Sequence, residues 1–139
     1  MDESTRRAWV PAAVLLGIGY ALVGILFAIP GTHALAWRLA AWVVSAIGYA
    51  GHIAYERFRL RDSPGSAAVH VALAVALGAF GLAVGANIHA LSTGKPNQHQ
   101  GLLLLSLVIW PVITALPAFV VALVTGLVLM RARDGKQVN

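Results

Sequence analysis

The stretch Ala67–Leu91 reads AAVHVALAVALGAFGLAVGANIHAL and contains no aspartate, glutamate, lysine or arginine. An α-helix rises about 1.5 Å per residue, so about 20 apolar residues cross the roughly 30 Å hydrocarbon core of a bilayer. Three further stretches are predominantly apolar and similarly long, namely Trp9–Ile29, Leu35–Tyr55 and Leu102–Met130. The sequence therefore predicts an all-α integral membrane protein with four transmembrane helices.

The composition supports this class and limits the organisation of the chain. Of its 139 residues, 59% are hydrophobic and 11% are charged, whereas soluble domains have about 25% charged residues. The loops between the apolar stretches are too short for a separate soluble domain, so we expect a single domain over residues 1–139. Short loops also favour an up-down bundle, in which sequential helices pack antiparallel. The chain has no cysteine, which excludes disulfides, thiol chemistry and cysteine-bound metals.

The positions of the basic residues predict how the chain is oriented. Eight of the ten lysine and arginine residues lie in the termini and the second loop, and only Arg38 and Lys95 lie near the first and third loops. Cytoplasmic loops are enriched in these residues, so both termini are expected in the cytoplasm (N-in/C-in). We expect the membrane to be the cytoplasmic membrane of a bacterium or archaeon. Because the basic residues flank apolar stretches, the net charge of +5 does not indicate nucleic acid.

The first apolar stretch has an alternative interpretation as a cleavable signal peptide. Arg6 and Arg7 precede it, and the residues Ala34–Ala36 resemble a cleavage site. The apolar run is, however, longer than the roughly 7–15 residues of a signal sequence. We therefore expect the first helix to be retained as a membrane span.

Polar residues recur at intervals of seven on the second apolar stretch. Arg38, Ser45 and His52 follow this spacing, and Tyr49 lies on the same helical face. Hydrocarbon cannot satisfy their hydrogen bonds, so this face is expected to point into the bundle. Hydrogen bonds between helices would be enough to explain the pattern, and a ligand-binding cavity is the second interpretation. Such a cavity would be lined by Tyr20, Arg38, Ser45, Tyr49, His52, Asn87 and Thr114.

Glycines on the third apolar stretch form another pattern. Gly78, Gly81 and Gly85 share one helical face. Such small residues let the backbone of a neighbouring helix approach closely. We expect these glycines to act in helix packing, within the chain or in a homo-oligomer.

The histidines allow an alternative interpretation as cofactor ligands. His52 and His70 are expected at similar depth on adjacent antiparallel helices. Their imidazoles could be the axial ligands of a b-type haem, and the glycine face could admit the macrocycle. His89, near the opposite end of its helix, could then serve a second haem or a quinone. A transition metal is less favoured, because Glu56 is the one carboxylate nearby and is expected to extend to the membrane interface.

Several functional groups are missing from the sequence, and this narrows the function. No aspartate or glutamate lies deep in an apolar stretch, which argues against proton- or cation-coupled transport. There is also no nucleophile–base pair or phosphate-binding loop for hydrolysis. The favoured function is a non-enzymatic membrane subunit or small-ligand-binding protein with a polar intramembrane cavity, and the alternative is b-type haem and quinone electron transfer. Expected partners are membrane lipid and a second copy of the chain or a larger membrane complex.

Overall fold

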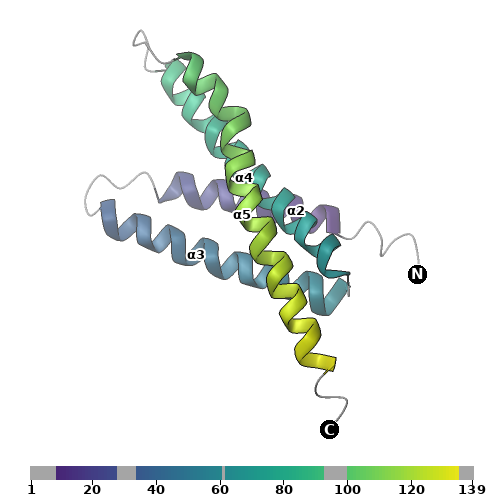
Figure 1. Cartoon of the computed structure of the whole chain (residues 1–139). Helices are drawn as coiled ribbons and strands as arrows, with labels where there is room; N and C mark the ends of the chain where they lie inside the picture. Colours follow the sequence, from purple (N-terminus) through teal and green to yellow (C-terminus); the bar gives the residue numbers. More distant parts are fainter. Residues whose placement is uncertain (1–8, 28–33, 61, 93–99, 135–139) are drawn as a thin grey trace.

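A computed structural model of the chain describes residues 9–27, 34–60, 62–92 and 100–134 (Figure 1). These residues are almost entirely helical and contain no β-strand, which confirms the all-α prediction. The elements are the helices α2 (Trp9–Leu26), α3 (Ala34–Ala54), α4 (Pro64–Ser92) and α5 (Gln100–Asp134), with the short π-helix η1 (Tyr55–Leu60) directly after α3.

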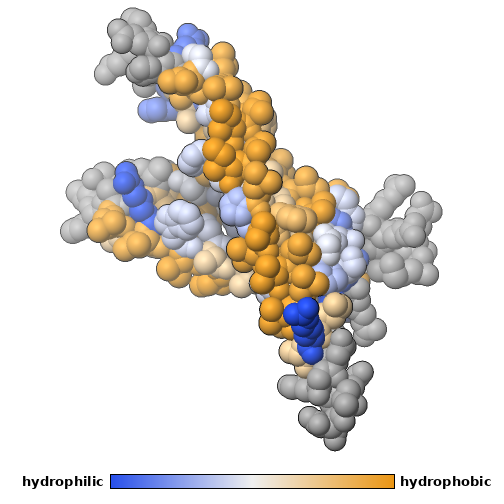
Figure 2. Space-filling view, in the orientation of Figure 1, coloured by the Kyte–Doolittle hydropathy of each residue, from blue (hydrophilic) through white to orange (hydrophobic). Residues whose placement is uncertain are grey.

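Three of the four long helices are long and apolar enough to cross a membrane. They are α2, α4 and the part of α5 that spans Gln100–Ala132. Helix α3 is not among them. In Figure 2, apolar side chains cover the face of α5 that is turned to the viewer, which is consistent with a membrane-embedded protein.

Helix α4 begins earlier than the predicted start near Ala67, and local capping explains why. The main-chain N–H of Ser66 donates a hydrogen bond to the Ser63 hydroxyl oxygen at 3.2 Å, so Ser63 caps the helix N-terminus. Pro64 occupies the first helical position, where no main-chain donor is required. Helix α5 is also longer at both ends than the predicted 102–130.

The four helices converge at one end and diverge at the other. Helices α4 and α5 run side by side and antiparallel over most of their lengths, α2 crosses α4, and α3 makes few contacts with α4 or α2 (Figure 1). The core lies where the helices cross and is built around Ile53, Ala68, Val71 and Ala122. Because only one end of α3 is packed into this core, the rest of α3 stands apart from α4 and α5.

Glycines allow α2 and α4 to pack closely where they cross. A Cβ atom on Gly78 would lie 2.6 Å from Tyr20 Cβ and 3.1 Å from the Gly17 carbonyl oxygen. A Cβ atom on Gly81 would lie 2.9 Å from Ala21 Cβ, so neither position has room for a side chain. Gly85 differs, because the nearest atom to its added Cβ is Ile25 Cδ1 at 3.8 Å, an ordinary contact distance.

Candidate functional site

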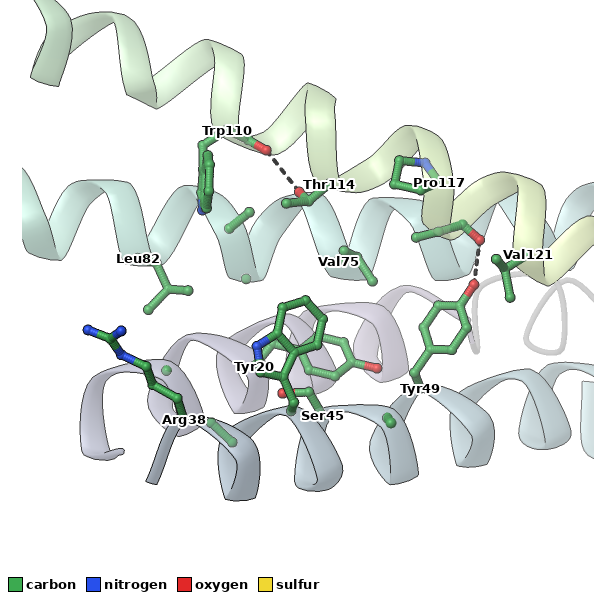
Figure 3. Close-up of a pocket in the computed structure, with 17 residues that line it drawn as sticks. Tyr20, Arg38, Ser45, Tyr49, Val75, Leu82, Trp110, Thr114, Pro117 and Val121 are labelled. Carbon is green, nitrogen blue, oxygen red and sulfur yellow. Dashed lines mark hydrogen bonds between the residues drawn. The ribbon is translucent and has the colours of Figure 1, made fainter. Parts of the chain in front are cut away.

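A cleft of about 550 Å³ separates α3 from the other three helices (Figure 3). Its walls are mostly apolar and aromatic, and they include Trp42 of α3 and Trp110 of α5. Small residues such as Gly78 and Ala79 of α4 line the cleft as well, and this leaves space that larger side chains would fill. The cleft exists because α3 is attached to the core mainly through its C-terminal end.

Five of the seven residues expected to line a cavity line this cleft, namely Tyr20, Arg38, Ser45, Tyr49 and Thr114. The other two have different surroundings. His52 is buried beside Glu56. Asn87 donates hydrogen bonds from Nδ2 to the carbonyl oxygens of Ala83 at 2.8 Å and Leu103 at 2.9 Å, so it joins α4 to α5.

The hydroxyl groups in the cleft differ in how they are bonded. The Tyr49 hydroxyl donates a hydrogen bond to the Ala118 carbonyl oxygen of α5 (Figure 3). The Thr114 hydroxyl donates to the Trp110 carbonyl oxygen of its own helix at 2.9 Å. The Tyr20 hydroxyl is buried and has no hydrogen-bond partner among the described residues. Of these three groups, Tyr20 therefore retains the capacity to bond a ligand.

Arg38 supplies the charge of the cleft. It is the only charged side chain in the lining, and it extends across one end of the cleft toward Leu82 of α4 (Figure 3). No carboxylate of the described residues pairs with it, and all five acidic residues lie in the termini or in the segment that joins α3 to α4. The cleft thus combines a cation at one end with aromatic and aliphatic walls.

The expected cavity did not include the two tryptophans of the cleft. Trp42 is 76% exposed, and exposed tryptophans of membrane proteins commonly act as anchors at the membrane interface. The sequence spacing indicates that both tryptophans could line the cavity, because Trp42 lies seven residues before Tyr49 and Trp110 lies four residues before Thr114. Each tryptophan therefore shares a helical face with a predicted cavity residue.

A second cluster of polar side chains lies at the junction of α3, η1 and α4. His52 Nε2 lies 3.3 Å from Glu56 Oε1, and His70 Nδ1 lies 3.0 Å from Glu56 Oε2. His70 Nδ1 also lies 3.5 Å from Asp62 Oδ2. The indole of Trp9 stacks on the His70 imidazole, with ring centroids 4.0 Å apart. Glu56 is completely buried, so its side chain is enclosed by the protein and does not extend outward as a snorkelling side chain would.

The contacts of Glu56 and Asp62 alter their acidity in opposite directions. Burial raises the pKa of Glu56, but the adjacent His52 and His70 imidazoles outweigh it and hold the pKa below its usual value. Burial raises the pKa of Asp62, and the adjacent Glu56 carboxylate raises it further. The cluster thus places two carboxyl groups close together in a largely buried position.

The structure brings His52 and His70 together, but with a carboxylate contacting both rings. His89 lies in the last turn of α4, at the other end of that helix from His70. A haem between His52 and His70 would require Glu56 to withdraw from both imidazoles. Haem ligation by these residues stays a prediction.

Comparisons with protein-family models, with curated proteins and with solved structures found no match to this chain.

Proposed function

We propose that the protein binds an amphipathic anion in the cleft between α3 and the other helices, without transforming it. The ligand would be a lipid-like molecule with a phosphate or similar anionic headgroup and a long apolar chain. The observation that carries this proposal is the position of Arg38, a cation without a carboxylate partner among the described residues, at the end of an otherwise apolar cleft.

The proposal includes the insertion of all four helices, with both termini in the cytoplasm. The face of α3 opposite its polar residues carries the exposed side chains Leu39, Val43 and Ile47, which suit contact with acyl chains. The polar face would then be turned to the cleft, because lipid cannot satisfy its hydrogen bonds. In this orientation Arg38 lies near the outer surface, at the depth of lipid headgroups.

The groups of the cleft match the two parts of such a ligand. A guanidinium group binds phosphate with two parallel hydrogen bonds, and such charge-assisted bonds are stronger than neutral ones. The indole rings of Trp42 and Trp110 offer apolar surface to a chain. The unpartnered Tyr20 hydroxyl offers one polar contact deeper in the cleft. These are groups that recognise a ligand and orient it.

Quenching of tryptophan fluorescence tests the proposal directly. Purified protein in detergent is titrated with phosphatidylglycerol that carries brominated acyl chains, and separately with phosphatidylcholine of the same chains. We expect saturable quenching by the anionic lipid and weaker quenching by the zwitterionic lipid. Arg38→Gln should weaken binding of the anionic lipid at least about tenfold, since a hydrogen bond to a charged group contributes about 1.5–3 kcal/mol.

The matched control is Arg59→Gln, because Arg59 is an exposed cation of η1 outside the cleft. It should bind phosphatidylglycerol as the unmodified protein does. Equal quenching by the two lipids, or equal affinities of the Arg38→Gln and unmodified proteins, would contradict an anion site at Arg38.

A further inference from the structure

The polar cluster at the junction of α3, η1 and α4 lies outside the cleft and needs its own explanation. Its four members are two histidines and two carboxylates: His52, Glu56, Asp62 and His70. Glu56 is completely buried and His52 is 1% exposed. Charged groups are costly to bury unless they are paired or bind a metal ion, so these side chains must be compensated locally.

The π-helix brings the members of the cluster together. In η1 the backbone makes a wider turn than in an α-helix, and the main-chain N–H of Asp62 donates to the Glu56 carbonyl oxygen at 3.3 Å. The Arg57 guanidinium donates to the Asp62 carbonyl oxygen at 3.3 Å and fixes the same turn. Asp62 is thereby directed back toward Glu56 and toward His70 of α4.

The distances in the cluster are close to those between ligands of one small cation. Zinc binds histidine nitrogen and carboxylate oxygen at about 2.0–2.2 Å, so neighbouring ligand atoms of a tetrahedral site lie about 3.3–3.6 Å apart. Two of the observed separations, 3.3 and 3.5 Å, fall in this range. The third, 3.0 Å between His70 Nδ1 and Glu56 Oε2, is slightly shorter and is that of a hydrogen bond. One ligand atom from each of Glu56, Asp62 and His70 lies within 4.8 Å of the others, and His52 adjoins this group of three through its 3.3 Å approach to Glu56 Oε1.

His52 provides an independent observation that points to a ligand. Neither of its ring nitrogens has a hydrogen-bond partner among the described residues, although the side chain is buried. Its Nε2 atom faces Glu56 Oε1 at 3.3 Å, but the angles are not those of a hydrogen bond, and Glu56 Oε1 also lacks a partner. These two buried atoms face each other without a hydrogen bond. Two ligand atoms of one shared ion would be placed in the same way.

The stacked Trp9 ring gives the cluster a feature that metal sites use. The two ring planes are 3° from parallel, so Trp9 restrains the orientation of the His70 imidazole. Groups that orient a ligating histidine commonly increase metal affinity. Trp9 itself would provide no ligand atom.

We propose that Glu56, Asp62 and His70, with the adjacent unpartnered His52 imidazole as a fourth donor, form a binding site for one divalent transition metal ion of the zinc type. The donor set is two imidazole nitrogens and two carboxylate oxygens, which suits Zn²⁺ and related ions. A divalent cation would neutralise the two carboxylates and would give the unbonded His52 nitrogen and Glu56 oxygen a common partner. The ion would also hold the C-terminal end of α3 and η1 against α4.

Calorimetric titration with Zn²⁺ tests the site, using full-length protein in detergent without a polyhistidine tag and after treatment with a chelator. We expect one Zn²⁺ per chain, with a dissociation constant of about 1 µM or tighter. His70→Ala should weaken binding at least about tenfold. The matched control is His89→Ala, because His89 is an exposed histidine of the same helix outside the cluster, and this variant should bind as the unmodified protein does.

Asp62→Asn keeps the test decisive if a variant of a more buried residue fails to fold. The Asp62 side chain is 25% exposed and its change is nearly isosteric, so the fold should persist while Zn²⁺ binding weakens at least about tenfold. The proposal is overturned if the unmodified protein binds no Zn²⁺ stoichiometrically. It is equally overturned if folded Asp62→Asn protein retains full affinity, or if His89→Ala weakens binding as much as His70→Ala does.

Discussion

The Tyr49 hydroxyl on α3 donates a hydrogen bond to the main-chain carbonyl oxygen of Ala118 on α5. Both residues line the cleft, so the bond crosses it from one wall to the other. Among the described residues it is the one hydrogen bond that joins these two helices. Since α3 makes few other contacts with the rest of the protein, this bond fixes the width of the cleft at that point.

Replacing Tyr49 by phenylalanine should widen the cleft but lower the stability of the protein only slightly. A hydrogen bond between membrane helices contributes about 0.6 kcal/mol on average, so the free energy of unfolding should fall only slightly. The separation of α3 and α5 should increase and become more variable. Spin labels at Ile47 and Val120, which are exposed, measure it by pulsed electron paramagnetic resonance, and cysteines can be introduced directly because the chain has none.

The control for this experiment is Tyr55→Phe, since Tyr55 is a partly exposed tyrosine of η1 outside the cleft. Its distance distribution should match that of the unmodified protein. If Tyr49→Phe also leaves the distribution unchanged, the hydrogen bond to Ala118 does not set the position of α3.

Gly78→Ala should destabilise the protein through the contact between α2 and α4. The new Cβ would meet Tyr20 Cβ at 2.6 Å and the backbone oxygen of Gly17 at 3.1 Å, and neither can move without shifting a helix. Excess volume in a packed site costs about 1–3 kcal/mol. Unfolding by sodium dodecyl sulfate, followed by circular dichroism, would measure the loss.

Gly19→Ala is the matched control, because a Cβ on Gly19 meets nothing within 4 Å. Both changes gain the same intrinsic helix propensity of about 1 kcal/mol. The difference between the two variants therefore isolates the steric effect. Equal stabilities would show that α2 and α4 are not in close contact at Gly78.

The sequence predicted the helices and much of the cleft because both depend on periodic features. Apolar length located all four helices, and the seven-residue spacing placed Arg38, Ser45 and Tyr49 on one face. The sequence could not predict that α3 would stand apart from α4 and α5, because the position of a helix depends on contacts distant in the chain. It indicated which side chains share a face, but not what that face would enclose.

The histidine cluster shows a different limit of sequence analysis. The matched depth of His52 and His70 followed from helix length and antiparallel packing. The burial of Glu56 and the approach of Asp62 depend on a π-helix, whose hydrogen bonds have a different spacing from those of the α-helix. Helical periodicity of about 3.6 residues per turn cannot predict which residues such a segment brings together.

Replacing Asn87 by leucine should loosen the pair α4 and α5 near the end where α4 finishes. Asn87 donates to the Leu103 carbonyl oxygen at 2.9 Å, which links the two helices. Loss of this bond should lower the free energy of unfolding by about 0.6 kcal/mol, with an upper limit near 1.7 kcal/mol. Unfolding in sodium dodecyl sulfate would measure the change.

Ser106→Ala provides the control for Asn87, because both side chains donate to the same acceptor. The Ser106 hydroxyl bonds to the Leu103 carbonyl oxygen at 2.6 Å, but within its own helix. Its loss should therefore have little effect on the contact between helices. A larger destabilisation by Ser106→Ala than by Asn87→Leu would contradict a linking role for Asn87.

The orientation of the chain in the membrane can be tested with two single cysteines at opposite ends of α5. Gly101→Cys and Ala132→Cys introduce exposed thiols, and no other cysteine competes for the label. If both termini are cytoplasmic, as the lysine and arginine distribution predicts, a membrane-impermeant maleimide added to intact cells should label Gly101→Cys only. In permeabilised cells the maleimide should label both variants equally, and this controls for a difference in reactivity between the two thiols. Labelling of Ala132→Cys in intact cells would reverse the proposed orientation, and Arg38 would then face the cytoplasmic leaflet and bind its ligand from there.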